Sequence, residues 1–190
     1  VYSQIIHKDY GGVVPELASK NHEELINSIV KIAVDKAFIS FIDIDAIAVT
    51  QGPGLIGSLI IGLNYAKGLS IGLNVPFIGI NHLEGHLHSG ILDMNISYPY
   101  LCLLVSGGHT QIWYVHKEDE YKIISTTVDD AAGEAFDKGA KMLGLGYPGG
   151  PEIEKISING NPYSYPFTIP KIRKNPLNFS FSGLKTALLY

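Results

Sequence analysis

Residues 44–80 constrain the fold most, because their pattern predicts a strand, a turn, a helix and a second strand. Ile44–Thr50 is a short β-branched run, typical of a buried strand. Gly52-Pro53-Gly54 turns the chain into a glycine-rich helix that ends near Leu73, and Pro76–Ile80 is a second short apolar run. A helix between two buried strands is the βαβ unit of a mostly parallel sheet, so we expect an α/β fold.

The pattern changes in the second half of the chain, where strands follow one another without helices between them. Tyr100–Val105 and Gln111–Val115 flank a Gly107-Gly108 turn and predict a hairpin, and Tyr121–Thr127 predicts a third strand. A helix is expected over Asp129–Leu143.

This change predicts two lobes, residues 1–97 and residues 98–190. The first lobe also carries a helix over Glu16–Phe38, whose apolar residues recur at helical spacing. Little periodicity is visible between Gly149 and Ser180. The chain starts at Val1 without a methionine and stops at Tyr190 within an expected helix, so we expect it to be a piece of a longer protein.

Composition excludes several classes of protein. The 190 residues carry a net charge of −4, so no overall positive field predicts nucleic-acid binding, and such contacts must be local. The single cysteine, Cys102, excludes a disulfide framework and suits the cytoplasm.

Glycines and Lys67 interrupt the apolar stretch Ile56–Leu73, which predicts a buried helix and no membrane span. No signal peptide is visible.

His82-Leu83-Glu84-Gly85-His86 predicts a metal site. Residues four apart stack on one helix face, so the two imidazoles can share one ion. The helix of zinc proteases has its glutamate directly after the first histidine, whereas Glu84 lies about 200° around the helix from His82. The alternative is a histidine pair that only lines the helix, and a catalytic ion needs at least one more protein ligand.

Two glycine turns are candidate anion sites. Gln51-Gly52-Pro53-Gly54 precedes a helix but lacks the Gly-Lys-Ser/Thr of a phosphate loop, and an ordinary tight turn accounts for it better. The turn in Leu104-Val105-Ser106-Gly107-Gly108-His109-Thr110 joins two strands, and its glycines would let a phosphate approach the backbone. Its alternative is a plain hairpin turn.

The helix expected from Asp129 carries a charged face at helical spacing, formed by Asp130, Glu134, Asp137 and Lys141. Ion pairs Glu134–Lys138 and Asp137–Lys141 would make it an ordinary solvated face. A substrate contact by Asp137 is the other interpretation. Gly149-Gly150-Pro151 predicts a rigid turn that presents backbone amides to a ligand. Lys171, Arg173 and Lys174 form a small basic cluster, either solvated or in contact with phosphates.

Taken together, the motifs resemble the TsaD family of tRNA threonylcarbamoyladenosine synthases, formerly described as glycoproteases. The resemblance covers essentially the whole chain, in its bacterial form. The matching segments, in order, are Ser3-Gln4, His7, Tyr10–Ser19, Gln51–Leu55, His82–His86, Leu104–Gln111, Asp129–Lys138, Tyr147–Pro151 and Phe179–Thr186.

The resemblance implies a bilobal actin-like, sugar-kinase or chaperone-ATPase (ribonuclease H-like) fold, truncated at both ends. It implies transfer of a threonylcarbamoyl group from threonylcarbamoyl-AMP to the exocyclic amine of the adenosine 3′ of the anticodon, in tRNAs reading codons that begin with adenine. His82 and His86 would hold one divalent metal ion, iron or alternatively zinc. The implied substrate-binding residues are Leu104, Val105, Ser106, Gly107, Gly108, Asp137 and Gly150.

The resemblance further implies a third metal ligand, an aspartate, and a substrate-binding asparagine beyond Tyr190, so the chain alone is expected to be inactive. It implies a paralogous TsaB-like scaffold subunit and a TsaE-like ATPase as partners, and no membrane. The catalytic base is not evident.

Three other interpretations remain: a metalloprotease, a different carbamoyltransferase of the same fold, and a non-catalytic scaffold paralogue. The position of Glu84 argues against the metalloprotease.

Overall fold

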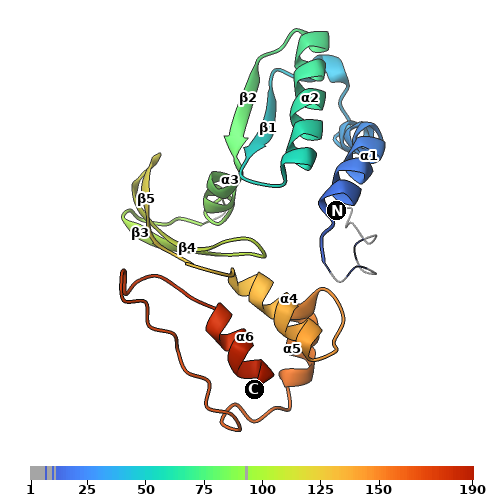
Figure 1. Cartoon of the computed structure of the whole chain (residues 1–190). Coiled ribbons are helices and arrows are strands. Elements are labelled where there is room, and N and C mark those ends of the chain that lie inside the picture. Colours follow the sequence, from blue (N-terminus) through green and yellow to red (C-terminus); the bar gives the residue numbers. More distant parts are fainter. Residues whose placement is uncertain (1–6, 8–9, 11, 93) are drawn as a thin grey trace. The chain divides into compact units, whose positions relative to one another are not determined.

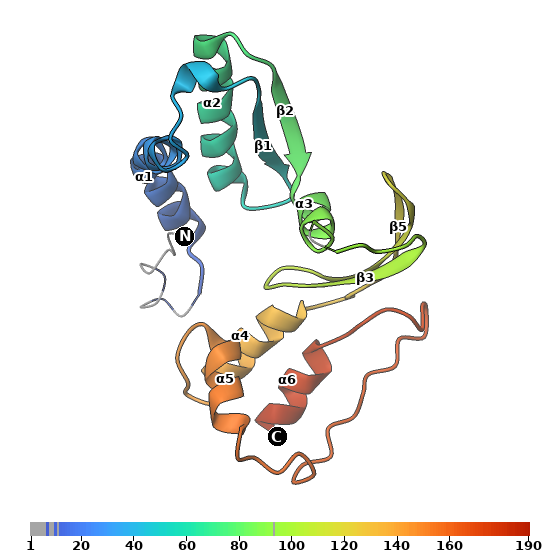
Figure 2. The same ribbon diagram turned by 180° about the vertical axis from the view of Figure 1, so that it is seen from behind.

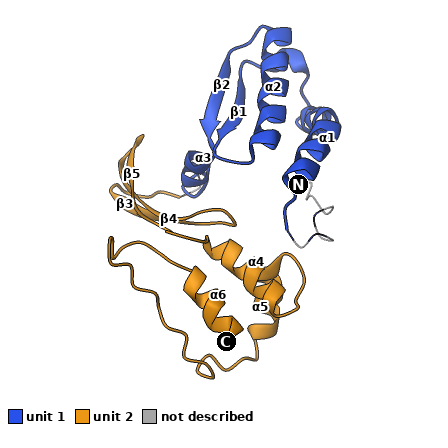
Figure 3. Cartoon of the chain, viewed as in Figure 1, with its two compact units in different colours: residues 1–92 blue, residues 93–190 orange. Residues whose placement is uncertain are grey.

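The structure is a computed structural model that describes residue 7, residue 10, residues 12–92 and residues 94–190 (Figure 1). Ser3, Gln4 and Gly11, which belong to the segments quoted for the family, lie outside the described residues. The chain divides into two compact units, residues 1–92 and residues 93–190 (Figure 3). The second lobe predicted from the sequence starts at residue 98.

The first unit contains the predicted βαβ arrangement. Strand β1 (Ile47–Gly52) pairs in parallel with β2 (Phe77–Asn81). Helix α2 (Ile56–Leu73) connects them and packs against β1. It ends at Asn74, whose left-handed backbone (φ 55°) is one that asparagine tolerates better than most residues. The parallel pair predicted for this part of the chain is therefore confirmed.

Helix α1 (Pro15–Lys36) precedes this arrangement and packs against α2. Proline at the first position suits a helix start, because its missing amide hydrogen has no partner there anyway. Gly57 of α2 lies so close to Ser19 of α1 that a side chain at Gly57 would collide with the Ser19 hydroxyl. A short 3₁₀-helix, η2 (Phe41–Asp43), leads from α1 towards β1.

The prediction that α2 is a buried helix and that β1 and β2 are buried strands is wrong for this chain, because neither strand has a buried residue. Ala66 is the one buried residue of α2, and Ile56 and Ile71 are 77% and 81% exposed. The described part of unit 1 has only two strands and α1 to pack against α2, so most of its surface stays uncovered. By length and composition alone α2 could cross a membrane. This is weak evidence for a membrane span, because core helices of soluble proteins share both properties.

The second unit begins with an antiparallel sheet in the order β3 (Tyr100–Val105), β4 (Thr110–Lys117), β5 (Glu120–Thr126). The predicted hairpin and third strand are thus confirmed. Trp113 and Val115 of the central strand are buried, as are Leu104 and Ser125 of its neighbours.

Three helices complete this unit: α4 (Ala132–Met142), α5 (Gly149–Ser157) and α6 (Ser182–Leu189). Both α5 and α6 pack on α4, and the three lie together in both views (Figure 1, Figure 2). Two sequence expectations are wrong here. Helix α4 starts at Ala132 rather than Asp129, and Gly149-Gly150-Pro151 is the first turn of α5 rather than a rigid loop.

Candidate functional site

The histidine helix α3 (His82–Ser89) begins directly after β2 because Asn81 caps it. The Asn81 side-chain oxygen accepts hydrogen bonds from the backbone amides of Leu83, at 2.9 Å, and Glu84, at 3.4 Å. Leu83 and Leu87, four residues apart, are buried and fix one face of the helix. His82 and His86 are thereby left exposed, one turn apart.

The two imidazoles converge as the sequence predicts. Their Nε2 atoms lie 3.2 Å apart, and their ring centroids are separated by 4.5 Å. Two ligands at 2.0–2.1 Å from one ion, with an angle of 90–110° between them, would be about 2.8–3.4 Å apart. The pair therefore fits two positions of a metal shell, although a hydrogen bond between the rings also accounts for the distance.

A complete metal shell is not present in the described part of the chain. No group of three His, Cys, Asp or Glu side chains able to hold an ion occurs among residues 7, 10, 12–92 and 94–190. Two imidazoles alone leave at least one protein ligand to be supplied for a catalytic ion.

The turn between β3 and β4 is closed by its own hydrogen bonds. The Ser106 amide donates to the His109 carbonyl at 2.8 Å, and the His109 amide donates to Ser106 Oγ at 3.0 Å. Gly107 and Gly108 at its tip are exposed, with open space where a side chain would be. Among the described residues, no acceptor lies within hydrogen-bonding distance of the Gly107 or Gly108 amide. These two donors are available to a ligand oxygen.

The same turn caps helix α4. The Ala132 amide donates to Thr110 Oγ1 at 2.9 Å, and the Gly133 amide donates to the Ser106 carbonyl at 3.3 Å. A side chain at Gly133 would lie 2.8 Å from the Ser106 oxygen and 2.9 Å from the Gly107 Cα, so only glycine permits this approach. Helix α4 has no cap from its own N-cap residue, Ala131. The turn therefore serves as its cap.

Asp137 lies one turn after Gly133, on the same face of α4. Its Oδ1 accepts a hydrogen bond of 2.7 Å from the Gly149 amide, the first residue of α5. A side chain at Gly149 would lie 2.7 Å from the Asp137 Cα, so the two helices meet closely here. The predicted Asp137–Lys141 ion pair does not form among the described residues. Burial, reinforced by the charge of Asp137, raises the pKa of the nearby Tyr147 phenol.

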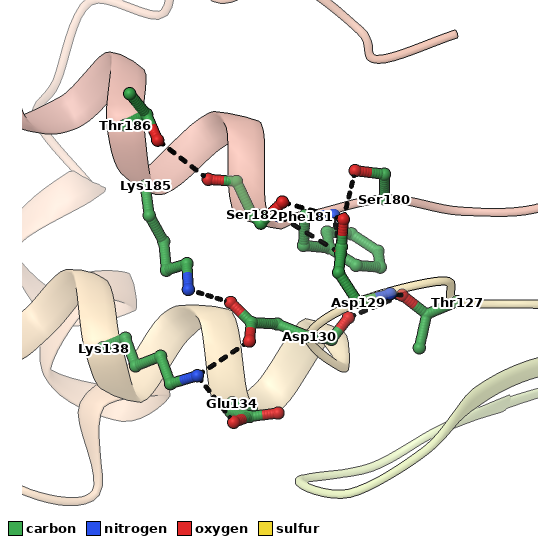
Figure 4. A network of polar contacts seen from close by, with 10 residues as sticks. All are labelled: Thr127, Asp129, Asp130, Glu134, Lys138, Ser180, Phe181, Ser182, Lys185 and Thr186. Carbon is green, nitrogen blue, oxygen red and sulfur yellow. Dashed lines mark hydrogen bonds and ion pairs between the residues drawn. The ribbon is translucent and has the colours of Figure 1, made fainter. Parts of the chain in front are cut away.

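Asp129 caps helix α6 (Figure 4). Its Oδ1 accepts from the backbone amides of Phe181, at 2.8 Å, and Ser182, at 3.2 Å. Its Oδ2 accepts from the hydroxyls of Ser180, at 2.6 Å, and Ser182, at 2.8 Å. Partial burial acts to raise the pKa of Asp129, but the four hydrogen bonds outweigh it and lower the pKa to about 2.

Asp130 connects α4 to α6 through two lysines (Figure 4). It pairs with Lys138, at 2.7 Å, and with Lys185. Hydrogen bonds from both ammonium groups lower the pKa of Asp130. Lys138 also forms the predicted pair with Glu134, at 2.7 Å, and these hydrogen bonds raise its pKa. Asp130 and Asp137 of the predicted charged face therefore connect α4 to α6 and α5, whereas Glu134–Lys138 is the predicted ion pair within α4.

Several of the predicted substrate-binding residues lie close together in unit 2, whereas the predicted metal ligands belong to unit 1. The turn residues Ser106 and Gly107 contact α4 at Gly133, and Asp137 and Gly149 follow along the same helix. Gly150 is next in α5, while the Leu104 side chain is buried, which leaves only its backbone for a ligand. Val105 is 55% exposed. His82 and His86 belong to the other unit.

Sequence reasoning missed the structural roles of Thr110, Asp129 and Lys185. Each makes its contact across at least 20 residues of chain, so no local spacing predicts the partner. Thr and Asp are nevertheless among the residue types that often cap helices. That preference is the one signal in the sequence that could have pointed to Thr110 and Asp129.

Comparison with known proteins gives a consistent result along the whole chain. The sequence model of the family TsaD, "tRNA N6-adenosine threonylcarbamoyltransferase", matches residues 1–190. Proteins of that description are 55% identical over 193 residues in Dictyoglomus turgidum and 53% identical over 192 residues in Thermosipho africanus, in both cases over 100% of this chain. The relative in Syntrophotalea carbinolica is 49% identical over 191 residues.

The chain spans only a little over half of these relatives: 57%, 58% and 56% of their respective lengths. Among solved structures, YeaZ from Pseudomonas aeruginosa is 17% identical, with a TM-score of 0.37 over 58% of this chain and 52% of that chain. That resemblance is too low to carry an argument.

Proposed function

Because the chain belongs to the TsaD family of tRNA N6-adenosine threonylcarbamoyltransferases, we propose that the whole protein transfers a threonylcarbamoyl group to tRNA. The donor is threonylcarbamoyl-AMP, and the acceptor is the exocyclic amine of the adenosine 3′ of the anticodon, in tRNAs that read codons beginning with adenine. The family match over residues 1–190 is the observation that carries this proposal.

We further propose that His82 and His86 hold one divalent ion, iron in preference to zinc. The 3.2 Å between their Nε2 atoms supports this, as does their exposure on a helix fixed by Leu83 and Leu87. When bound, such an ion supplies Lewis-acid polarisation of a carbamoyl or phosphate oxygen. The remaining ligand is proposed to lie outside the described residues, since no group of three metal-binding side chains occurs among them.

The adenylate is proposed to bind in unit 2, at Leu104–Gly108, Asp137 and Gly150. Support comes from the free amides of Gly107 and Gly108, which suit a phosphate oxygen, and from the contact of this turn with α4. Asp137 accepts one hydrogen bond from Gly149 through Oδ1, which leaves further acceptor capacity on its carboxylate for a substrate contact. The role of these residues is to orient the adenylate, and the group that takes the proton from the amine is unassigned.

The other parts of the proposal follow from the family. They are a bilobal actin-like fold for the whole protein, a cytoplasmic location, a TsaB-like scaffold and a TsaE-like ATPase as partners, and no membrane. Lys171, Arg173 and Lys174 are proposed to contact tRNA phosphates, since they are exposed and have no acidic partner among the described residues.

Nucleoside analysis of tRNA tests the activity. Cells depleted of this gene are expected to lose threonylcarbamoyladenosine, and a plasmid copy of the whole protein should restore it. Unchanged nucleoside content after depletion would contradict the proposal. Restoration by a His82→Ala variant would contradict the metal site alone.

The metal site is tested independently of activity by elemental analysis of the purified whole protein. His86→Ala should lose the metal, because one imidazole cannot replace the pair. His88→Ala is the matched control, since His88 is exposed on the same helix but lies outside the i,i+4 pair. Equal metal content in both variants would refute the assignment.

A further inference from the structure

The part of the chain from the last turn of α5 to Tyr190 has an unusual distribution of charge. Residues 155–190 contain no aspartate or glutamate and five cations, out of 14 cations and 18 acidic residues in the chain. Residues 1–154 therefore carry nine cations and 18 acidic residues, a net charge of −9, against +5 for the rest. Lys185 of α6 pairs with Asp130, whereas Lys171, Arg173 and Lys174 lie between α5 and α6 and are exposed, so these three cations are available to a polyanion.

Two tyrosines stand out in the same segment. Tyr163 is 91% exposed and Tyr165 is 74% exposed, so neither ring is covered by the described part of the chain. Exposed aromatic rings and cations in one segment are the composition with which proteins stack on unpaired bases while holding the phosphates. Arg173, the only arginine of the chain, adds a planar group that can stack as well as pair.

Prolines hold the segment open. Pro162, Pro166 and Pro170 follow one another at intervals of four residues, and Pro176 comes next. Each fixes its own φ and favours an extended residue before it. Apart from a turn around residues 162–165, residues 161–172 have no helix or strand (Figure 1). A stiff, extended segment loses little conformational freedom when it binds.

Both ends of the segment are fastened to unit 2. It starts from α5, and at the far end Ser125 Oγ of β5 donates to the Leu177 carbonyl at 2.5 Å. The Phe179 amide donates to the Thr126 carbonyl at 3.1 Å, and Asp129 then caps α6. The exposed residues 161–174 are thus a loop held at defined points.

We infer that residues 161–174 form an RNA-binding loop in which Tyr163 and Tyr165 stack on unpaired bases and Lys171, Arg173 and Lys174 contact phosphates. The inference rests on the proposed function, which supplies an RNA whose target adenosine lies beside the anticodon, in an unpaired loop. The tyrosines make this loop a reader of unpaired nucleotides rather than a general polyanion site.

The test compares binding of two RNAs to the whole protein: an anticodon stem-loop, and an uninterrupted duplex of equal length and charge. Replacing both tyrosines by leucine should weaken stem-loop binding by roughly fivefold or more and leave duplex binding unchanged. Replacing both by phenylalanine keeps the rings and should keep the affinity. Phe38→Leu is the control for an exposed aromatic ring outside the loop, since Phe38 is 96% exposed.

The cations are tested by the dependence of stem-loop affinity on salt. Replacing Lys171, Arg173 and Lys174 by alanine should make the slope of log affinity against log salt shallower by about 2, at roughly 0.7 for each lost phosphate contact. Alanine at Lys20, Lys31 and Lys36, three exposed lysines of α1, is the matched control and should leave the slope unchanged. Circular dichroism checks that all variants are folded.

Three results would overturn the inference: wild-type affinity of the leucine variant for the stem-loop, an unchanged salt slope in the triple variant, or no binding of either RNA by the wild-type protein. Loss of binding to a protein partner, with RNA binding intact, would also overturn it. Nucleoside analysis separates this from the proposed function. A protein that shows the expected binding pattern but makes no threonylcarbamoyladenosine would support the loop and refute the activity.

Discussion

Asp129 is the residue with the most concentrated set of hydrogen bonds in unit 2, since one carboxylate accepts from two amides and two hydroxyls at the start of α6. Asp129→Asn places an NH₂ group among these donors. We expect it to lower the free energy of unfolding of the whole protein by about 1 kcal/mol at pH 7, the usual cost of losing a helix cap. Urea unfolding measures the change, and Asp45→Asn, at an exposed carboxylate of unit 1, is the control.

The pH dependence of this effect has a definite sign. The pKa of Asp129 falls from its usual 3.8 to about 2 in the folded protein. The hydrogen bonds that lower this pKa stabilise the folded protein fully above about pH 4, where the Asp129 carboxylate is charged. Their contribution is lost as the pH falls through about 2 and the carboxylate is protonated. The difference in stability between wild type and Asp129→Asn should therefore shrink between pH 4 and pH 2. A constant difference over this range would show that the carboxylate charge is not what holds α6.

Gly149 is tightly surrounded by other atoms, whereas its neighbour Gly150 has open space around it. Substitutions at the two positions can therefore distinguish a role in packing from a role in binding. A side chain at Gly149 would lie 2.6 Å from the Ala140 Cβ and 2.7 Å from the Phe136 carbonyl oxygen, whereas at Gly150 the nearest atom is 4.0 Å away. Gly149→Ala should cost about 1–3 kcal/mol of stability, and Gly150→Ala less than about 0.5 kcal/mol.

Gly150→Ala also tests the proposed contact between Gly150 and the adenylate. If this contact exists, the variant should bind a non-hydrolysable threonylcarbamoyl-AMP analogue more weakly in calorimetry. Its stability should remain that of the wild type. Wild-type affinity in this variant would remove Gly150 from the site.

At the scale of elements, the sequence predicts what is periodic and local. The strands around α2 and the three strands of the antiparallel sheet follow from alternating or β-branched runs, so they could be predicted. Helix α5 could not, because it starts with Gly-Gly-Pro and its first amide is bonded to Asp137, twelve residues earlier. The start of α4 was misplaced for a similar reason: Asp130 has helical spacing with Glu134, but Asp129 caps α6 and Asp130 pairs with the α6 lysine Lys185, so neither belongs to α4.

Helix α4 depends on β4 for its cap, which gives a prediction at the level of this element. Thr110 is 2% exposed, and its Oγ1 is the acceptor for the Ala132 amide. Thr110→Val keeps the shape and leaves that amide without its partner, so the whole protein should lose about 1–2 kcal/mol of stability in urea unfolding. Thr186→Val, at an exposed hydroxyl of α6, should change stability by less than about 0.5 kcal/mol. Equal effects would show that the hydroxyl of Thr110 does not cap α4.

At the scale of the molecule, the site separates into a part that the sequence predicts and a part that it does not. The histidine pair follows from i,i+4 spacing alone, and the 3.2 Å between the two Nε2 atoms agrees with it. The grouping of Ser106, Asp137 and Gly149 depends on contacts between a hairpin and two helices, which no spacing encodes. The resemblance to a family, rather than the local pattern, is what drew Ser106, Asp137 and Gly150, the neighbour of Gly149, into one site.

The exposed surface of residues 1–190 leads to a prediction about the whole molecule. Two separate compact domains that share 20.6 kDa would expose about 10,700 Å², whereas this chain exposes 13,554 Å². Large apolar side chains are part of this exposed surface: Ile71, Leu101 and Leu103 are each more than 60% exposed. Because the relatives are longer than this chain, we expect the rest of the whole protein to cover these residues.

Residues 1–190 expressed alone should therefore bind the hydrophobic dye ANS strongly and unfold over a broad range of urea, whereas the whole protein should bind little dye and unfold cooperatively. The reason is that the nine buried apolar residues described in this chain are few for its length, so its packing alone gives a weak core. Replacing Ile71 by serine provides a check on the cause. It should reduce dye binding in residues 1–190, where the side chain is exposed, and destabilise the whole protein, where it is covered. Equal dye binding by the two proteins, with equally cooperative unfolding, would mean that this surface is exposed in the whole protein as well.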